Sequence, residues 1–160
     1  MEDFSQNLGY LLSKSAKIMK WHFNEALKNY DLTAAQWSVI KDLSIQMELL
    51  HASQNSASGI QGHPLSPAAV ALRLYYDRPT ISGIIDRLEK NGWVVRKPNP
   101  DDRRSQIIEL TEKSESLIHE LNHHGNDIME RAVAGFDSDE LVALKAYLGR
   151  MIVNLSKEGD

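Results

Sequence analysis

The sequence contains no cysteine among its 160 residues. This absence excludes structural disulfides, zinc sites built from thiolates, thiol nucleophiles and peroxide sensing through cysteine. No apolar run approaches the roughly 20 residues that are needed to span a bilayer. The N-terminal segment MEDFSQNLGYLLSK has neither the basic start nor the uninterrupted apolar stretch of a signal peptide. We therefore expect a soluble, cytoplasmic protein without a membrane partner.

The motifs of common enzyme classes are also missing. Ser5, Ser13 and the other serines lie in no nucleophile elbow, and the sequence has no glycine-rich phosphate loop. The carboxylates are spread over the surfaces of expected helices rather than gathered in one place. We therefore predict no catalytic residues, no cofactor and no enzymatic activity.

The composition fits one globular domain with extended helical arms, because 160 residues with 42% hydrophobic content can bury one core. The net charge of −4 is unfavourable for binding nucleic acid, but it is unevenly distributed. Residues 73–104 hold eight lysines and arginines against five acids, a net charge of +3, and the remainder holds 10 against 17, a net charge of −7. A basic edge on an acidic body would attract phosphate at one surface. A solvated, charged helix face is the alternative interpretation.

A helix is predicted between Asp77 and Asn91-Gly92. Asp77 is a favourable N-cap, and Pro79 stands where the first helical turn tolerates proline. Asn91-Gly92 is a typical C-terminal signal. Apolar residues recur at helical spacing on one face, namely Ile81, Ile84, Ile85 and Leu88.

A β-hairpin is predicted directly after this helix. The segments Trp93–Arg96 and Gln106–Leu110 are rich in β-branched and aliphatic residues, as strands are. Between them, the segment from Lys97 to Arg104 is polar and interrupted by two prolines. This pattern indicates a hairpin with a cationic tip. Helix, turn, strand, basic loop and strand follow one another in the order of a winged DNA-binding module.

Three helices are predicted before this module. Residues 4–30 carry one apolar stripe along a long helix, and Thr33 is a plausible N-cap for a second helix. The segment 46–64 begins helical and then turns into serine, asparagine, glutamine and glycine, which indicates a loop. A short third helix is expected over residues 66–74.

Two more helices are predicted after the module. Thr111 caps a long helix that runs to about Ala134, with Leu117, Leu121 and Ile128 as its apolar positions. A last helix starts at Asp137 or Ser138 and again carries an apolar stripe. The stripes at both ends of the chain exceed the needs of one small core, so we expect these helices to pack against a second copy.

Three motifs follow one another along the chain: Leu32-Thr33 with Gln36-Trp37, the segment Thr80–Gly92, and Asp102-Arg103-Arg104 followed by Leu110-Thr111. The first resembles an LTxxQ(W/F) helix start, the second a TVxxxxDRLExxG recognition helix, and the third a DxR wing with its closing LT. These are motifs of the multiple-antibiotic-resistance regulator (MarR) family of bacterial winged-helix transcription factors. In this order and spacing, they give a resemblance to that family over nearly the whole chain.

The resemblance implies a mainly α fold, a winged helix-turn-helix with a small β-hairpin wing, flanked by long N- and C-terminal dimerisation helices. It implies a homodimer that binds double-stranded DNA at a pseudo-palindromic operator, with a helix in each major groove and the wing along the minor groove. The expected DNA-binding residues are Arg78, Thr80, Ser82, Gly83, Arg87, Asp102, Arg103 and Arg104. Asp102 is expected to hold the wing turn, and Arg104 to enter the minor groove.

We accordingly expect residues 1–160 to form a single MarR-like domain. Residues 33–110 would form the winged-helix DNA-binding lobe, and residues 1–32 and 111–160 the dimerisation helices. The sequence departs from the family pattern at Gly83, where a longer polar residue is common, and at Tyr75-Tyr76, where a glycine is frequent. It also has Ala69 in place of an acid and a longer loop over residues 46–64.

The expected function is that of a repressor that is released by a small molecule, for example an aromatic acid. The candidate ligand-binding residues are Lys14, Trp21, His22 and Trp37, although aromatic residues at helical spacing are more often core. A metal-responsive member of the same family is an alternative, because His119 and His123 lie four residues apart near Glu115 and Glu120. A winged-helix module that binds another protein is a second alternative.

Overall fold

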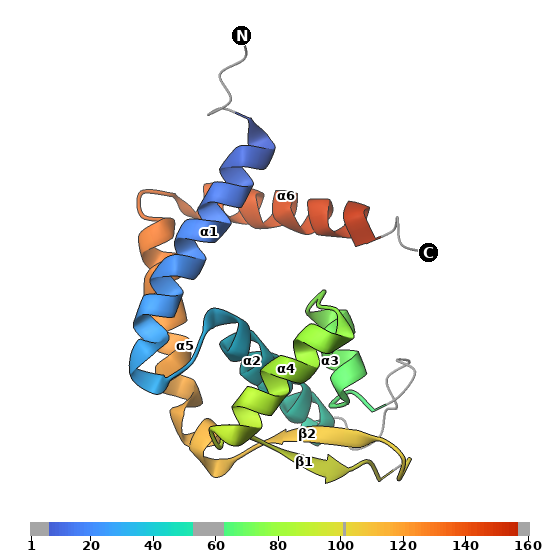
Figure 1. Cartoon of the computed structure of the whole chain (residues 1–160). Helices are drawn as coiled ribbons and strands as arrows, with labels where there is room; N and C mark the ends of the chain where they lie inside the picture. Colours follow the sequence, from blue (N-terminus) through green and yellow to red (C-terminus); the bar gives the residue numbers. More distant parts are fainter. Residues whose placement is uncertain (1–6, 53–62, 101, 157–160) are drawn as a thin grey trace.

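The computed structural model describes residues 7–52, 63–100 and 102–156. Its elements, in chain order, are α1 (Leu8–Leu27), the 3-10 helix η2 (Lys28–Tyr30), α2 (Ala34–Ala52), α3 (Pro67–Arg73), α4 (Arg78–Lys90), β1 (Val94–Pro98), β2 (Gln106–Leu110), α5 (Glu112–Ala132) and α6 (Ser138–Ser156). The fold is therefore mainly α, with one two-stranded antiparallel sheet. Figure 1 shows a winged lobe, made of α2, α3, α4 and the hairpin, beside the long helices α1, α5 and α6.

Side chains fix the starts of the helices where the sequence predicts them. Thr33 and Gln36 form a reciprocal capping box before α2, in which each side chain accepts a hydrogen bond from the other residue's backbone N–H. Asp77 caps α4 and Thr111 caps α5. Asp137 rather than Ser138 caps α6. Each of these side chains satisfies backbone N–H groups that a helix leaves unpaired in its first turn.

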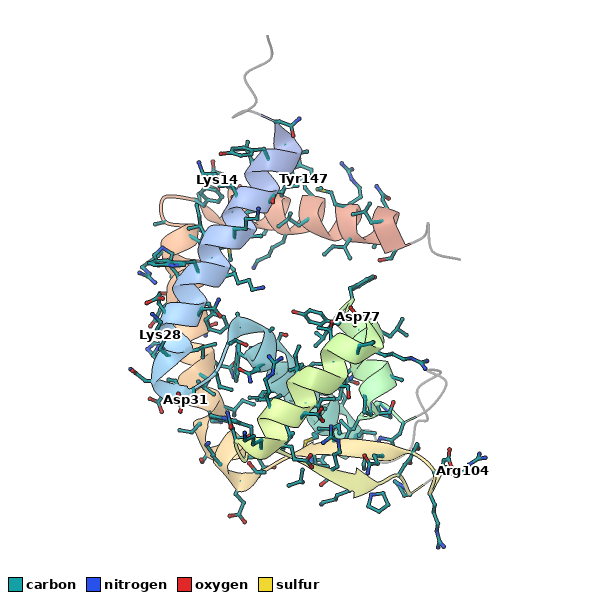
Figure 2. The ribbon with its side chains drawn as sticks, viewed as in Figure 1. Lys14, Lys28, Asp31, Asp77, Arg104 and Tyr147 are labelled. Carbon is teal, nitrogen blue, oxygen red and sulfur yellow. The ribbon has the colours of Figure 1, made fainter. Side chains whose placement is uncertain are left out.

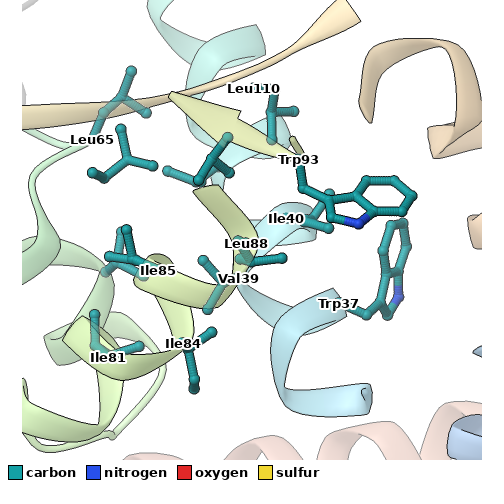
Figure 3. Packing of buried hydrophobic residues seen from close by; sticks show 14 of the residues in the cluster. Trp37, Val39, Ile40, Leu65, Ile81, Ile84, Ile85, Leu88, Trp93 and Leu110 are labelled. Atoms are coloured by element: carbon teal, nitrogen blue, oxygen red, sulfur yellow. The ribbon is translucent and has the colours of Figure 1, made fainter. Parts of the chain in front are cut away.

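The lobe is built around one apolar core. Figure 3 shows Ile81, Ile85 and Leu88 of α4 against Val39 and Ile40 of α2, and the exposed fraction of each of these five side chains is 0%. The predicted apolar face of α4 is therefore confirmed. Leu121 of α5 belongs to the same core, so the lobe and α5 are continuous, and α5 in turn packs against α1.

Several predicted boundaries shift for local reasons. The first helix begins at Leu8 and tightens into the 3-10 turn η2, while Phe4 lies outside the described residues, as does most of the predicted 46–64 loop. The first strand starts at Val94 instead of Trp93, because Trp93 is buried and its N–H bonds the Leu88 carbonyl oxygen.

The first strand also extends through Pro98, which pairs with Gln106. A two-stranded sheet has only edge strands, so proline is tolerated there. The fifth helix stops at Ala132, before the predicted Ala134, and Gly135 takes a φ of 90° in the turn that follows.

Candidate DNA-binding surface

The N-terminus of α4 is organised by Asp77 and Thr80. One carboxylate oxygen of Asp77, Oδ1, accepts the backbone N–H of Thr80 at 2.7 Å. The other oxygen, Oδ2, lies 2.9 Å from the Thr80 hydroxyl oxygen. The hydrogen bonds from the backbone and the side chain of Thr80 lower the pKa of Asp77, so its carboxylate is ionised at neutral pH.

The outer face of α4 is polar and open. Arg78, Ser82 and Arg87 are exposed on it, and Gly83 is half-buried among them. A Cβ atom added to Gly83 would meet nothing within 4 Å. The helix therefore presents hydroxyl and guanidinium groups with no large apolar side chain between them, beside a point where another molecule can approach the backbone.

The tip of the hairpin is a closed network. Asp102 Oδ1 accepts the backbone N–H of Arg104 at 3.0 Å and its Nε at 3.2 Å, so the acid holds the turn as expected. The backbone carbonyl of Asp102 accepts both the N–H and the hydroxyl of Ser105. Asn99 closes the other side by donating from its amide to the Ser105 hydroxyl at 2.9 Å. The Arg104 side chain remains 92% exposed beyond this network.

Arg96 joins the hairpin to α4, a contact that was not predicted from the sequence. Its guanidinium donates to Asp86 Oδ1 at 2.5 Å and also pairs with Glu89, both of which belong to α4. Partial burial opposes the charge, but hydrogen bonds and attraction from the two carboxylates raise the pKa of Arg96 above its ordinary value. The acids at positions 86 and 89 lie one turn apart, which is the one signal that could have suggested a shared partner.

Several of the lysines and arginines counted in residues 73–104 are paired with carboxylates, so fewer of them are available to bind phosphate. Arg73 makes a two-bond ion pair with Asp42, Nε to Oδ1 at 2.8 Å and Nη2 to Oδ2 at 2.6 Å, and both side chains are largely buried. Lys97 belongs to strand β1 instead of the hairpin tip and pairs with Glu109 at 2.5 Å. Within the described part of residues 73–104, the cations without a carboxylate partner are Arg78, Arg87, Lys90 and Arg103.

Comparison with known proteins agrees with this geometry. A sequence model of the MarR family matches residues 58–105. The HTH-type transcriptional repressor NicR of Pseudomonas putida is 29% identical over 150 residues, which cover 94% of this chain and 85% of NicR. The crystal structure of wild-type MarR from E. coli is 25% identical with a TM-score of 0.67, and the match covers 91% of this chain and 96% of MarR. Over nearly its whole length, this chain is therefore similar to regulators of the MarR family.

Two further structures share the MarR fold. A mutant of E. coli MarR complexed with operator DNA gives a TM-score of 0.72 at 24% identity, over 94% of this chain and 99% of that one. BpsR of Bordetella bronchiseptica, whose DNA binding is regulated by 6-hydroxynicotinic acid, gives 0.73 at 24% identity, over 94% and 96%. This chain therefore has the winged helix-turn-helix fold of the MarR structures.

A cavity of about 650 Å³ lies between α1, α2 and α5, where the lobe meets the long helices. Its wall is mostly apolar, with Phe23 and Trp37 in edge-to-face contact at a centroid distance of 6.4 Å. Lys20 and Lys41 are the two cations on the wall. The acid on the wall, Asp42, is already neutralised by its pair with Arg73.

The four predicted ligand-binding residues are not brought together in this cavity. Trp37 lines it, but His22 lines a separate hollow of about 170 Å³. Trp21 is 59% exposed, with its ring edge-on to His22, and Lys14 lies over the Tyr10 ring at 5.5 Å. The face of α1 that lines the cavity carries Met19, Lys20 and Phe23. The predicted residues of α1 lie at other angles around the helix axis.

Two other expectations concern metal and membranes. In the residues that the structure describes, no group of three or more histidine and acidic side chains could hold a metal ion. His123 instead lies 3.4 Å from Asp127, measured from Nδ1 to Oδ1, and His124 lies 3.1 Å from the Tyr30 hydroxyl, which donates to Glu120. Among the described helices, none combines the length and the apolar character that crossing a membrane requires.

Proposed function

We propose that this MarR-family protein is a homodimeric repressor that binds a pseudo-palindromic operator and is released by a small organic acid. The two recognition helices would enter successive major grooves about one helical turn apart, roughly 34 to 36 Å. The wing of each subunit would follow the neighbouring minor groove. An effector that changes the distance between the two recognition helices would remove DNA contacts at both half-sites.

The observation that carries this proposal is the polar surface formed by α4 and the wing. The lobe buries every large apolar side chain of α4 and leaves Arg78, Ser82 and Arg87 outside. Figure 2 shows Asp77 and Arg104 on the right-hand side of the lobe, opposite Lys28 and Asp31. The DNA-binding residues we propose are Arg78, Thr80, Ser82, Gly83, Arg87, Arg103 and Arg104, with Asp102 holding the wing. A protein-interaction module would need no such wing.

Arg104→Ala tests the DNA-binding surface. We expect weaker binding to all DNA sequences and a salt slope smaller by about 1, because one phosphate or minor-groove contact is lost. The measurement is fluorescence anisotropy with DNA from upstream of the protein's own gene and with scrambled DNA, across a salt series. Lys28→Ala is the matched control, because it removes a cation on the opposite side of the molecule. An unchanged slope for Arg104→Ala would refute the wing assignment.

The proposed dimer rests on the helices outside the lobe. α6 has no buried residue, and large apolar side chains on α1 and α6 are exposed. They include Leu8, Leu11, Ile18, Val142, Tyr147, Ile152, Val153 and Leu155. Faces of this kind are stable in water when a second subunit covers them. We therefore keep residues 33–110 as the DNA-binding lobe, and 1–32 and 111–160 as dimerisation helices, within one domain over residues 1–160.

The effector site we propose is the cavity between α1, α2 and α5. Its apolar wall suits a flat organic body, and Lys20 and Lys41 suit a carboxylate. The regulation of BpsR by 6-hydroxynicotinic acid supports this class of ligand. Because the cavity is shared by the lobe and the long helices, an occupant there would change how the two parts are held relative to each other.

Lys20→Gln and Lys14→Gln separate this cavity from the site expected from the sequence. We expect Lys20→Gln to weaken the binding of 6-hydroxynicotinate or salicylate roughly 10-fold, because a charged hydrogen bond to the carboxylate is lost. Lys14→Gln should leave the affinity unchanged. Isothermal titration calorimetry gives the affinities, and anisotropy at saturating ligand shows whether DNA is released. The reverse pattern would favour the predicted set of Lys14, Trp21, His22 and Trp37.

We further propose that the protein acts in the cytoplasm and is not an enzyme, in keeping with regulators that bind operator DNA. The relatives are transcriptional regulators, which supports the absence of catalysis. The metal-responsive alternative would require side chains from a second subunit or from outside the described residues. Zinc titration by calorimetry tests this alternative, and saturable zinc binding would support it.

A further inference from the structure

Thr80 is the third residue of the recognition helix, so its side chain stands in the first helical turn beside the Asp77 cap. Both polar groups of Thr80 in this turn contact Asp77. The backbone N–H donates to Oδ1 at 2.7 Å, and the hydroxyl oxygen lies 2.9 Å from Oδ2. The side chain remains exposed on the outer face of the helix.

The direction of the hydroxyl hydrogen bond follows from the charge of Asp77. Its carboxylate is ionised at neutral pH, since its two hydrogen bonds with Thr80 lower the pKa of Asp77. An ionised carboxylate has no proton to donate and can only accept. The Thr80 hydroxyl must therefore donate its single proton to Asp77, and only its lone pairs are left for an outside partner.

A hydroxyl in this state can bind only a donor. Phosphate oxygens accept hydrogen bonds, so Thr80 cannot hold a phosphate, and the neighbouring carboxylate would repel one. In the major groove, the donors are the exocyclic amino groups, N6 of adenine and N4 of cytosine, whereas guanine and thymine present acceptors. Ser82 differs, because its hydroxyl has no hydrogen-bond partner in the described structure and is free to donate or accept.

We propose that Thr80 specifies adenine or cytosine at one position of each operator half-site by accepting a hydrogen bond from the base amino group. The Asp77 carboxylate fixes this polarity, so Asp77 is a positioning residue that touches no base. This inference rests on the proposed placement of α4 in the major groove. Gly83, three residues further along the same face, leaves open space beside Thr80 through which a base edge can approach.

The experiment measures relative affinities for an operator library in which each base pair is replaced in turn. Thr80→Val keeps the shape of the side chain and removes the hydroxyl. We expect it to lose discrimination at one position per half-site by roughly 2- to 12-fold, the range of a single neutral hydrogen bond. In the wild-type protein, that position should favour adenine or cytosine on the contacted strand. Ser82→Ala is the comparison variant at a second proposed contact, since it removes a hydroxyl whose polarity is not fixed. The bases favoured at any position that it alters should therefore not be limited to adenine and cytosine.

Asp77→Asn tests the polarity itself. Asparagine is an equally good N-cap, and its Oδ1 must face the Thr80 backbone N–H, which leaves the amide Nδ2 to donate to the Thr80 hydroxyl. The hydroxyl proton is then released for a base acceptor, so the preference should extend to guanine or thymine at the same position. Loss of the charge changes affinity for all sequences alike, and the readout is therefore the ratio between bases.

Three outcomes would overturn the inference: Thr80→Val alters no position, the altered position favours guanine or thymine in the wild-type protein, or Asp77→Asn leaves the base ratios unchanged. Thermal unfolding followed by circular dichroism confirms that both variants are folded before the comparison is made. Equal wild-type affinity for every DNA sequence is a separate result, which would refute the proposed repressor function itself.

Discussion

Similar apolar residues are buried in the lobe and exposed on the C-terminal helix α6. In the lobe, Ile81, Ile85 and Leu88 of α4 are completely buried. On α6, Ile152 and Leu155 recur at the same helical spacing, yet 60% and 70% of their surfaces are exposed. Helical periodicity therefore predicts an apolar face but not what covers it. The lobe covers its own apolar face, whereas we propose that a second chain covers that of α6.

The largest expected effect comes from charging the exposed face. Ile152→Asp combined with Leu155→Asp should give a folded monomer, because neither residue contributes to the core of the lobe. A monomer binds one half-site, so operator affinity should fall by roughly 100- to 10,000-fold through the loss of bivalent binding. Light scattering after size exclusion gives the mass, and anisotropy gives the affinity.

Asn154→Asp is the matched control for that experiment, because it adds a charge to the same exposed helix between the two apolar positions. It should remain dimeric. A double variant that stayed dimeric with full affinity would show that α6 does not form the interface.

The next effect in size comes from the lobe. Ile85→Ala leaves a cavity in a core where the side chain is 0% exposed, and should lower the free energy of unfolding by about 2–5 kcal/mol. Ile18→Ala is its counterpart on α1, where the side chain is 48% exposed in one subunit. It should weaken dimerisation and leave the unfolding of the lobe nearly unchanged. Urea denaturation at several protein concentrations separates the two, since only loss of the dimer depends on concentration. If both variants lost the same free energy of unfolding at every protein concentration, the assignment of Ile85 to the lobe core and of Ile18 to the dimer interface would be contradicted.

The sequence predicted the lobe well because its signals are local. The Asp77 cap, the proline at position 79 and the Asn91-Gly92 stop lie within one helix, and the structure confirms that helix. The Arg96 pair with Asp86 and Glu89 was missed because it joins a strand to a helix across a turn, where spacing along the chain gives no register. Of the four predicted ligand-binding residues, Trp37 alone lines the cavity, since Lys14 and Lys20 lie on different faces of α1.

The smallest expected effect concerns the contact that joins the two regions. Tyr75 ends the turn after α3 with a φ of 54°, a left-handed conformation that costs a non-glycine residue about 1–2 kcal/mol. Its side chain is 77% exposed, and its hydroxyl lies 2.7 Å from that of Ser156 at the end of α6. The hydrogen bond therefore connects the turn before the recognition helix with the helix that we assign to the dimer.

Tyr75→Phe removes this hydrogen bond and keeps the backbone and the ring. An exposed bond contributes about 0.5–1.5 kcal/mol at most, so the stability of the lobe should barely change. The hydrogen bond between Tyr75 and Ser156 instead limits how far α4 can move relative to α6, and hence relative to α4 of the second subunit. We expect Tyr75→Phe to tolerate an operator with one base pair inserted at its centre better than the wild-type protein does, as measured by anisotropy. Tyr76→Phe, which alters the neighbouring ring in the same way, should not.

Tyr75→Gly completes the comparison, because glycine adopts a φ of 54° without strain and also removes the contact. If the tyrosine serves only the turn, glycine should stabilise the lobe and leave the spacing preference intact. If it links the lobe to α6, glycine should stabilise the lobe and broaden the spacing preference as phenylalanine does. In the second case, the stability of the lobe and the preference for half-site spacing change independently. This is expected when two regions are stabilised by different contacts and are joined by one hydrogen bond.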